Sequence, residues 1–554
     1  MKSKKKSSLL IALVITALCQ PVWAAEGDLT QTRPGDSQNM DATLRQKPVA
    51  QDTESPVEKQ ADQQLVQPEY DQDSSIKFLL TKLNVDSSDI LTKAEIARIT
   101  AKYEGREVSL QDVNAAVLEI NQLYAKKQNV IARAVLAPQK IQEGVVNIKL
   151  AESHVGQYQI EGTKYTHAEY LTQRMFLKSD DLLRLDQLEE DVIRFNKTNG
   201  SQLRVVLVKG EKFGTTDVVL KVNEQPREQT VLFSDNAGSE TTGEYRAGAI
   251  WTINNLKSGG DSLTLNTTYA KGATGGGISY QIPIDYRGTQ LGVSYSKNQI
   301  NIISGAFQKL EIEGDSTDAS ISINHPFKTT LDNKLSSFIE LHKKSSNTYY
   351  SGFNPTPLTV KSVVMGLTEQ KYYSGGMTYK RFDLTTGYAY NKFYDSPATR
   401  DAFAKMNFSY ADRMMLPNNG TILLRVSGQF NTNPEKNLPS TEQFTLGGFS
   451  TVRGFKEGVL TGDKGYFISG EYHFPMGKTE GVVFLDHGGA FSYDGTTTPN
   501  NRNSYMTSMG IGMIANLAKN TSLQVFLGTP IDIPVAKGQY ADGPRWHFYM
   551  QHML

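Results

Sequence analysis

Residues 230–554 consist largely of segments of about ten residues in which apolar and polar side chains alternate. In residues 246–254, for example, Ala247, Ala249, Trp251 and Ile253 share one face of a strand, because successive side chains point to opposite sides. Such segments are typical of strands that cross a membrane. Lipid offers no hydrogen-bond partner to an open sheet edge, so the strands must close into a barrel. At about 20 residues per strand and connection, the region predicts about 16 antiparallel strands.

Aromatic residues and glycines become more frequent near residue 230. Residues 1–229 hold 11 aromatic residues and 9 glycines, whereas residues 230–554 hold 41 and 37. Strands and tight turns favour this composition, and we place the barrel at 227–554. Within it, Gly275, Gly276 and Gly277 are expected to form a hairpin turn and not a phosphate-binding loop. A soluble β-sandwich is the alternative, which the export signal, the length and the C-terminal segment disfavour.

The first 24 residues have the parts of an export signal. An apolar run at 9–18 follows a basic start, and cleavage is expected between Ala24 and Ala25. The run is too short to span a membrane, and no later apolar run reaches about 18 residues. Cys19 is the only cysteine, and the bulky Leu18 before it disfavours lipid attachment. Removal of the four lysines in 1–24 leaves 54 basic and 58 acidic residues, a net charge of −4.

Residues 25–72 are rich in Gln, Asp, Glu and Pro, with Tyr70 as the one aromatic residue. Such a segment cannot bury enough apolar surface to form a core. Four prolines confine any helix to the gaps between them, and residues 37–46 are the candidate. We therefore predict a linker region here.

Residues 73–226 repeat one order of elements. In 73–152, a strand at 76–85 precedes two helices and strands at 130–136 and 145–151. Thr92 and Glu95 form a capping box at the first helix, and Ser109 with Asp112 has the same pattern. In 153–226, a strand at 155–161 precedes helices near 166–175 and 185–195 and strands at 203–209 and 217–223. The chain therefore contains two small α+β domains.

Two short motifs near the C-terminal end contain an aspartate and an arginine. Phe484, Asp486 and Gly488 alternate, so they share one face of a strand. A carboxylate facing lipid would be costly, which places Asp486 in the lumen. Arg453 has a planar fork that can grip a carboxylate, and Gly454 would let the chain turn sharply beside it. His487 should point away from Asp486, and we interpret it as an interface residue and not a catalyst.

The last segment, residues 546–554, also alternates. Trp546, Phe548, Met550 and Leu554 fall on one face. This is the kind of C-terminal strand that barrel-assembly machinery reads, although its last residue is Leu554 where Phe is usual. The segment therefore predicts delivery to an outer membrane.

These motifs together resemble the two-partner-secretion outer-membrane transporters, the TpsB family, which includes hemolysin activators and CdiB-like proteins of the BamA-like superfamily. The two small domains look like tandem POTRA domains. Val452, Arg453, Gly454 and Phe455 match the V-R-G-F signature, and Phe484, Asp486 and Gly488 match its F-x-D-x-G strand motif. The resemblance implies that Arg453 lies at the tip of a long loop, expected at 432–464, which folds back into the lumen and pairs with Asp486. Further matches are Ala137-Pro138-Gln139, Gly144, Ile148 and Glu152 in the first small domain, and Asp235-Asn236-Ala237-Gly238, Asn254, Gly259-Gly260-Asp261 and Tyr280-Gln281-Ile282-Pro283 in the barrel.

The resemblance implies a function in protein export. Its partner would be a large unfolded exoprotein, TpsA- or CdiA-like, bound through an N-terminal secretion domain: an adhesin, a hemolysin, a heme-scavenging protein or a contact-dependent growth-inhibition toxin. The 25–72 region would hold a plug helix in the lumen, and the POTRA domains would be periplasmic. Other expected partners are outer-membrane lipid and the barrel-assembly machinery, and we expect a monomer. A BamA-like insertase and a non-specific porin are the alternatives.

Several classes of function find no support in the sequence. A mildly acidic chain has no broad basic face for nucleic acid. No Walker loop, HExxH, GxSxG or CxxC motif is present, and the eight histidines form no ligand pattern. We therefore expect no enzymatic activity, no catalytic residues, no metal and no cofactor.

Overall fold

The computed structural model describes residues 57–59, 77–127, 130–305, 308–352, 357–391, 398–433, 436–491, 505–532 and 543–554. The predicted export signal and the candidate plug helix at 37–46 lie outside these residues. The chain divides into two compact units, one of residues 52–224 and one that includes residues 225–554. Among the described helices, none is both long and apolar enough to span a membrane.

The first unit begins with a module of two helices and two small sheets. The single strand predicted at 76–85 is divided at Thr81 into two strands, one in each sheet. Both predicted capping boxes are confirmed, because the side chains of Thr92 and Ser109 accept the backbone N–H of Glu95 and Asp112, respectively. The strand at Arg106–Ser109 was not predicted, since it runs directly into the second helix. The elements are β2 (Lys77–Leu80), β3 (Lys82–Val85), α3 (Lys93–Thr100), β4 (Arg106–Ser109), α4 (Leu110–Lys126), β5 (Ala132–Val135) and β6 (Val145–Glu152).

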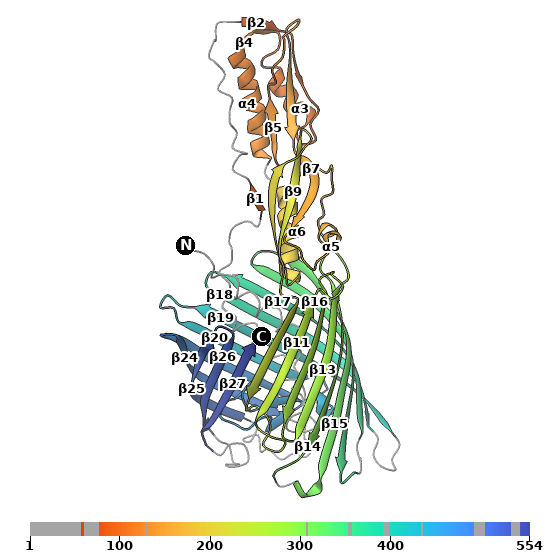
Figure 1. Ribbon diagram of the computed structural model, residues 1–554, viewed down its shortest axis with the longest axis vertical. Helices are drawn as coiled ribbons and strands as arrows, with labels where there is room; N and C mark the ends of the chain where they lie inside the picture. The colour runs from red at the N-terminus through yellow and green to blue at the C-terminus, as the bar shows by residue number, and fades with distance from the viewer. Residues whose placement is uncertain are drawn as a thin grey trace. The chain divides into compact units, whose positions relative to one another are not determined.

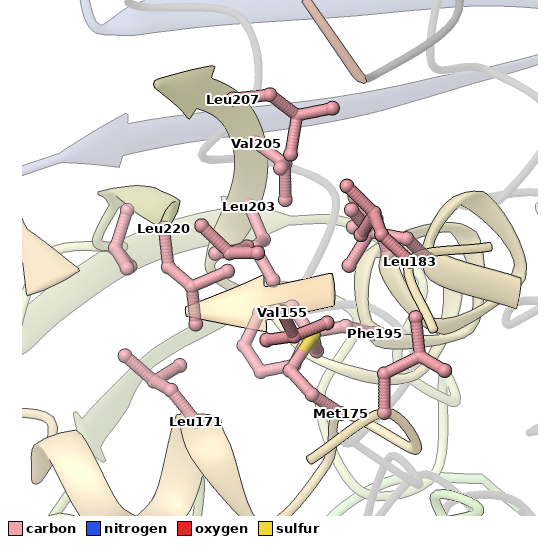
Figure 2. Close-up of a cluster of buried hydrophobic side chains, with 14 residues drawn as sticks. Val155, Leu171, Met175, Leu183, Phe195, Leu203, Val205, Leu207 and Leu220 are labelled. Carbon is pink, nitrogen blue, oxygen red and sulfur yellow. The ribbon is translucent and has the colours of Figure 1, made fainter. Parts of the chain in front are cut away.

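The second module of this unit has its own core (Figure 2), in which Val155, Phe195, Leu203 and Leu220 meet between the sheet and the helices. Its sheet has the order β1-β8-β9-β7. The short strand β1 (Val57–Lys59), which comes from the predicted linker region, pairs in parallel with β8. The other elements are β7 (His154–Glu161), α5 (Ala168–Thr172), α6 (Leu185–Thr198), β8 (Gln202–Lys209) and β9 (Thr215–Asn223).

One contact is repeated in both modules. In the first, the Asn121 side chain on α4 accepts the Ala134 N–H at 2.7 Å and donates to the Ala134 carbonyl at 3.2 Å. In the second, Asn196 on α6 makes the same pair of hydrogen bonds to Leu203, at 2.7 and 2.9 Å. In each module, an asparagine on the longer helix therefore hydrogen-bonds to the backbone of one strand. This strand is β5 in the first module and β8 in the second.

The second unit is a closed antiparallel barrel of 16 strands, as predicted (Figure 1). The Gly275–Gly277 prediction was wrong: these residues lie within a strand, and the turn is at Lys271-Gly272. The strands are β10 (Glu228–Asp235), β11 (Arg246–Asn254), β12 (Ser262–Ala270), β13 (Ala273–Pro283), β14 (Gln290–Asn301), β15 (Ile312–Thr329), β16 (Asn333–Tyr350), β17 (Leu358–Tyr373), β18 (Gly376–Asn391), β19 (Thr399–Met415), β20 (Thr421–Asn431), β23 (Lys464–Met476), β24 (Thr479–Phe491), β25 (Tyr505–Ala518), β26 (Thr521–Asp532) and β27 (Arg545–Met553).

The barrel closes where its first strand meets its last. β10 pairs with β27 over five residue pairs, from Val231↔Met553 to Asp235↔Tyr549. Beyond them, the Asn236 side chain donates to the Trp546 carbonyl at 2.9 Å and accepts the Phe548 N–H at 2.8 Å. The seam is thus shorter than the pairing of β15 with β16, which covers 17 residue pairs.

Candidate functional site

The connection from β20 to β23 folds into the barrel. It contains a short hairpin, β21 (Phe444–Leu446) with β22 (Leu460–Gly462), and the turn between these strands carries the V-R-G-F motif. Val452 and Phe455 are fully buried, packed with Leu446, Phe467 and other apolar side chains. An ordinary surface loop would leave such apolar residues exposed. This loop is therefore packed inside the lumen of the barrel.

Arg453 and Asp486 meet at this turn. Arg453 Nε donates to Asp486 Oδ2 and Nη2 donates to Oδ1, both at 2.8 Å, and the Arg453 backbone N–H reaches Oδ2 at 3.1 Å. The guanidinium carbon lies 3.5 Å from the centre of the Phe484 ring. Both charged side chains are almost fully buried. The guanidinium makes two hydrogen bonds to Asp486 and stacks on the Phe484 ring. Together, these contacts fix the position of the loop tip.

The pair belongs to a larger charged network that sequence reasoning missed. Glu471 on β23 lies 2.9 Å from Arg453 Nη2 and 3.0 Å from Arg425 Nη2 on β20. Ser469 donates to Asp486 at 2.7 Å, and His473 Nε2 lies 2.8 Å from Glu471. Odd-numbered residues of β23 face the lumen, and this alternation could have indicated Ser469, Glu471 and His473. The partner of Glu471 on β20 depends on strand register, which the sequence does not reveal.

Gly454 allows the loop to lie directly on the barrel wall. Its φ is +90°, and an added Cβ would lie 2.9 Å from the backbone carbon of Gly528 on β26. A Cβ at Gly528 would lie 2.6 Å from the Gly454 nitrogen. Two glycines therefore create the close backbone contact, and only Gly454 was singled out from the sequence. Gly488 leaves room for Leu446, whose side chain would be 2.9 Å from an added Cβ.

Further contacts hold the rest of the loop. Glu442 pairs with Lys405 at 3.0 Å and with Lys344, which lie on β19 and β16. Lys456 pairs with Glu240, in the connection after β10, at 2.9 Å. Phe449 lies against Phe526, His547 and Tyr549. The loop thus contacts widely separated strands of the barrel.

The remaining predicted residues lie elsewhere. Trp546 and Leu554 are exposed, and Phe548, on the same strand face as Trp546, is half-buried. His487 points away from Asp486, and its ring nitrogens lie 2.9 Å from the hydroxyls of Tyr466 and Thr507. These residues take no part in the loop site. Among the described residues, no cluster of His, Cys, Asp or Glu has the arrangement of a metal site.

Comparison with known proteins gives the family. A family model described as haemolysin secretion/activation protein ShlB/FhaC/HecB matches residues 214–514. A ShlB-type POTRA domain model matches residues 78–153. The first module is therefore a POTRA domain.

Similar proteins are transporters by name. The heme/hemopexin transporter protein HuxB of Haemophilus influenzae (strain 86-028NP) is 25% identical over 481 residues, which cover 82% of this chain and 84% of HuxB. The outer membrane transporter CdiB of Dickeya dadantii (strain 3937) is 24% identical over 490 residues, covering 82% and 83%.

Solved structures share the fold. CdiB from Escherichia coli matches with a TM-score of 0.62 at 18% identity, over 88% of this chain and 93% of that one. BamA from Haemophilus ducreyi lacking POTRA domains 1–3 matches with a TM-score of 0.54 at 13% identity, over 85% and 99%. The family model spans more than half of the sequence, so the chain belongs to the ShlB/FhaC/HecB family, whose members are outer-membrane β-barrel transporters of two-partner secretion.

Proposed function

We propose that this transporter exports one large exoprotein, which it receives unfolded in the periplasm through an N-terminal secretion domain. The relatives' names point to a hemopexin-binding exoprotein or a contact-dependent growth-inhibition toxin as cargo classes. The observation that carries the proposal is the loop held inside a 16-stranded barrel that follows small sheets with open edges. A non-specific porin would need neither feature.

We further propose that the second module is also a POTRA domain and that its strand β7 receives the cargo. An extended peptide can add to a sheet edge through main-chain hydrogen bonds. In the described part of this sheet, β8 already pairs with β1, and the Asn196 side chain hydrogen-bonds to the backbone of Leu203 on β8. β7 is the opposite edge of the sheet. Its start is covered, because Val155 exchanges backbone hydrogen bonds with Asp180 and Asp181. Further along, Gln157, Gln159 and Glu161 are exposed, so this part of β7 is the more accessible edge for a cargo strand.

In this proposal, the Arg453–Asp486 contact keeps the loop in its working position while the cargo threads through the lumen. Folding of the cargo outside the cell can bias the direction of transport. The energy source is then binding and folding and not a nucleotide. A plug helix in residues 25–72 would have to leave the lumen first.

The first test is a secretion assay. The chain is co-expressed with the large exoprotein encoded beside it, and cargo is measured at the cell surface and in the medium, with Arg453→Ala as the comparison. We expect external cargo with the intact chain and strongly reduced export with the variant. Cargo that stays in the periplasm beside a folded wild-type barrel would contradict this pairing, and barrel-insertion assays would then test an insertase function.

A further inference from the structure

The outer face of strands β16–β19 carries a basic cluster at the extracellular edge of its apolar band. On β17, the outward residues run from Glu369 near the periplasmic end through Leu367, Met365 and Val363 to Lys361 near the extracellular end. On β16, Ile339 and Leu341 are exposed, and Lys343 is the next outward residue. The two lysines therefore mark the level at which hydrocarbon gives way to lipid headgroups.

Lys343 and Lys361 face each other directly across the β16–β17 pair. Like charges in this position repel each other. Arg400 on β19 extends the cluster, with its guanidinium carbon 3.7 Å from the centre of the Tyr388 ring and 5.9 Å from that of Tyr390. Lys361 Nζ lies 5.6 Å from the centre of the same Tyr390 ring. Three cations are thus gathered on a few outward positions.

Protein carboxylates do not balance this charge within the described residues. Ion pairs within 4.0 Å are found for neighbouring inward cations such as Lys344 and Arg381, but for none of these three. The outward Asp315 on β15 accepts a hydrogen bond from Asn347 instead. At the periplasmic end of the same wall, by contrast, Lys380 pairs with Glu369 at 2.8 Å. Among the described residues, the extracellular cluster therefore lacks the ion pair that the periplasmic end has.

A shallow hollow of about 720 Å³ lies beside the two lysines. It crosses four adjacent strands, β15 to β18, and its outward lining includes Ile321, Leu341 and Val363 together with Lys343 and Lys361. Apolar side chains on the membrane side of a cationic rim fit a molecule with acyl chains and an anionic head. Basic residues at a membrane surface attract such headgroups, and charged hydrogen bonds to phosphate are strong.

We propose that this wall binds a phosphorylated glycolipid of the outer leaflet, of the lipid A type. A lipid phosphate lies between Lys343 and Lys361 with Arg400 beside it, and an acyl chain lies in the hollow. The phosphate relieves the repulsion between the lysines and fixes the lipid to the wall of the barrel. This inference rests on the outer-membrane location and does not depend on the identity of the cargo.

The test uses the full-length protein in nanodiscs of zwitterionic lipid with bisphosphorylated lipid A, or with dephosphorylated lipid A of the same acyl chains. The lipid A that remains with the barrel after mild detergent extraction is quantified by mass spectrometry. Lys343→Gln/Lys361→Gln removes two charges, and Lys371→Gln/Lys380→Gln removes two from the periplasmic ends of β17 and β18 as the matched control. Lys343→Arg/Lys361→Arg keeps the charge, and heat-modifiable gel migration checks the fold of each variant.

We expect the wild type, the arginine variant and the periplasmic control to retain the phosphorylated lipid roughly tenfold or more above the glutamine variant. Equal retention by wild type and the Lys343→Gln/Lys361→Gln variant would overturn the site. Equal retention of the two forms of lipid A by wild type would overturn phosphate recognition. Displacement of bound lipid A by inorganic phosphate would show that the acyl chains contribute nothing, and would overturn the lipid assignment.

Discussion

Arg453 and Asp486, 33 positions apart in the chain, meet inside the barrel through two hydrogen bonds of 2.8 Å that join one guanidinium to both oxygens of one carboxylate. Glu471 lies 2.9 Å from the same guanidinium. Arg453 therefore supplies positive charge to two carboxylates, so a substitution of Arg453 affects Glu471 as well as Asp486.

Truncation of Arg453 should destabilise the barrel strongly. Arg453→Ala leaves Asp486 and Glu471 buried with less counter-charge, at a cost of about 3–5 kcal/mol. Asp486→Asn should lose less, and the double variant should show a coupling of about 0.5–3 kcal/mol. Thermal unfolding in detergent measures all three. Additive losses would exclude a direct energetic interaction between the two residues.

Exchange of Arg453 and Asp486 should restore little export. If these two residues interacted with each other alone, exchanging them would be expected to restore export lost in either single variant. In the structure, the swap would bring an aspartate at 453 close to Glu471, and an arginine at 486 close to Ser469 and the neighbouring Arg425. We therefore expect little rescue of secretion by the double swap. Full rescue would mean that Glu471 and Arg425 contribute little.

Gly454→Ala should displace the loop tip. An added Cβ meets the Gly528 backbone at a φ of +90°, so both strain and a clash oppose the substitution. The expected loss is about 1–3 kcal/mol, together with faster cleavage of the loop by external protease. Gly470→Ala is the matched control, because an added Cβ on this β23 glycine meets nothing within 4 Å. Similar protease resistance of the Gly454→Ala variant and the control would contradict the close fit.

A photo-crosslinking amino acid at Gln159 should capture the secretion domain of the cargo. Gln159 is exposed on the edge strand β7, beyond the start of the strand that is bonded to Asp180 and Asp181. Arg204 is the matched control position, since it is exposed on β8, the strand that β1 and Asn196 already cover. Crosslinked cargo is measured by immunoblot. Capture at position 204 without capture at 159 would assign cargo binding to the other edge.

The start of α3 should loosen in acid. The backbone N–H and the hydroxyl of Thr92 hold the pKa of Glu95 at about 2, below its ordinary value of 4.5, with help from Lys127. Because the folded state has the lower pKa, the stabilisation is present above pH 4.5 and is lost as the pH falls from 4.5 towards about 2. Hydrogen exchange of the first amides of α3 should report this loss. In Glu95→Gln, which does not titrate, their protection should change much less across this window.

Local chemistry made part of the fold predictable. The capping residues Thr92 and Ser109 identify helix starts because the interaction lies within four residues. Alternation placed Asp486 on the lumen side for the same reason. Contacts set by strand register were not predictable: Arg425 reaches Glu471 across 46 positions, and Gly528 meets Gly454 from another strand. The turn predicted at Gly275–Gly277 was wrong because glycine is common in turns but also occurs within strands.

The short seam between β10 and β27 has a consequence for the order of assembly. Asn236 and Phe548, which bond across it, are 312 positions apart, whereas every other neighbouring pair in the barrel is close in the chain or joined by one loop. Bringing the ends of so long a segment together costs about 5 kcal/mol of chain entropy, against only five residue pairs gained. The seam should therefore form last. Until then, the edges of β10 and β27 have unpaired backbone groups, and lipid offers these groups no hydrogen-bond partner. The unfinished sheet therefore depends on another protein to cover both edges.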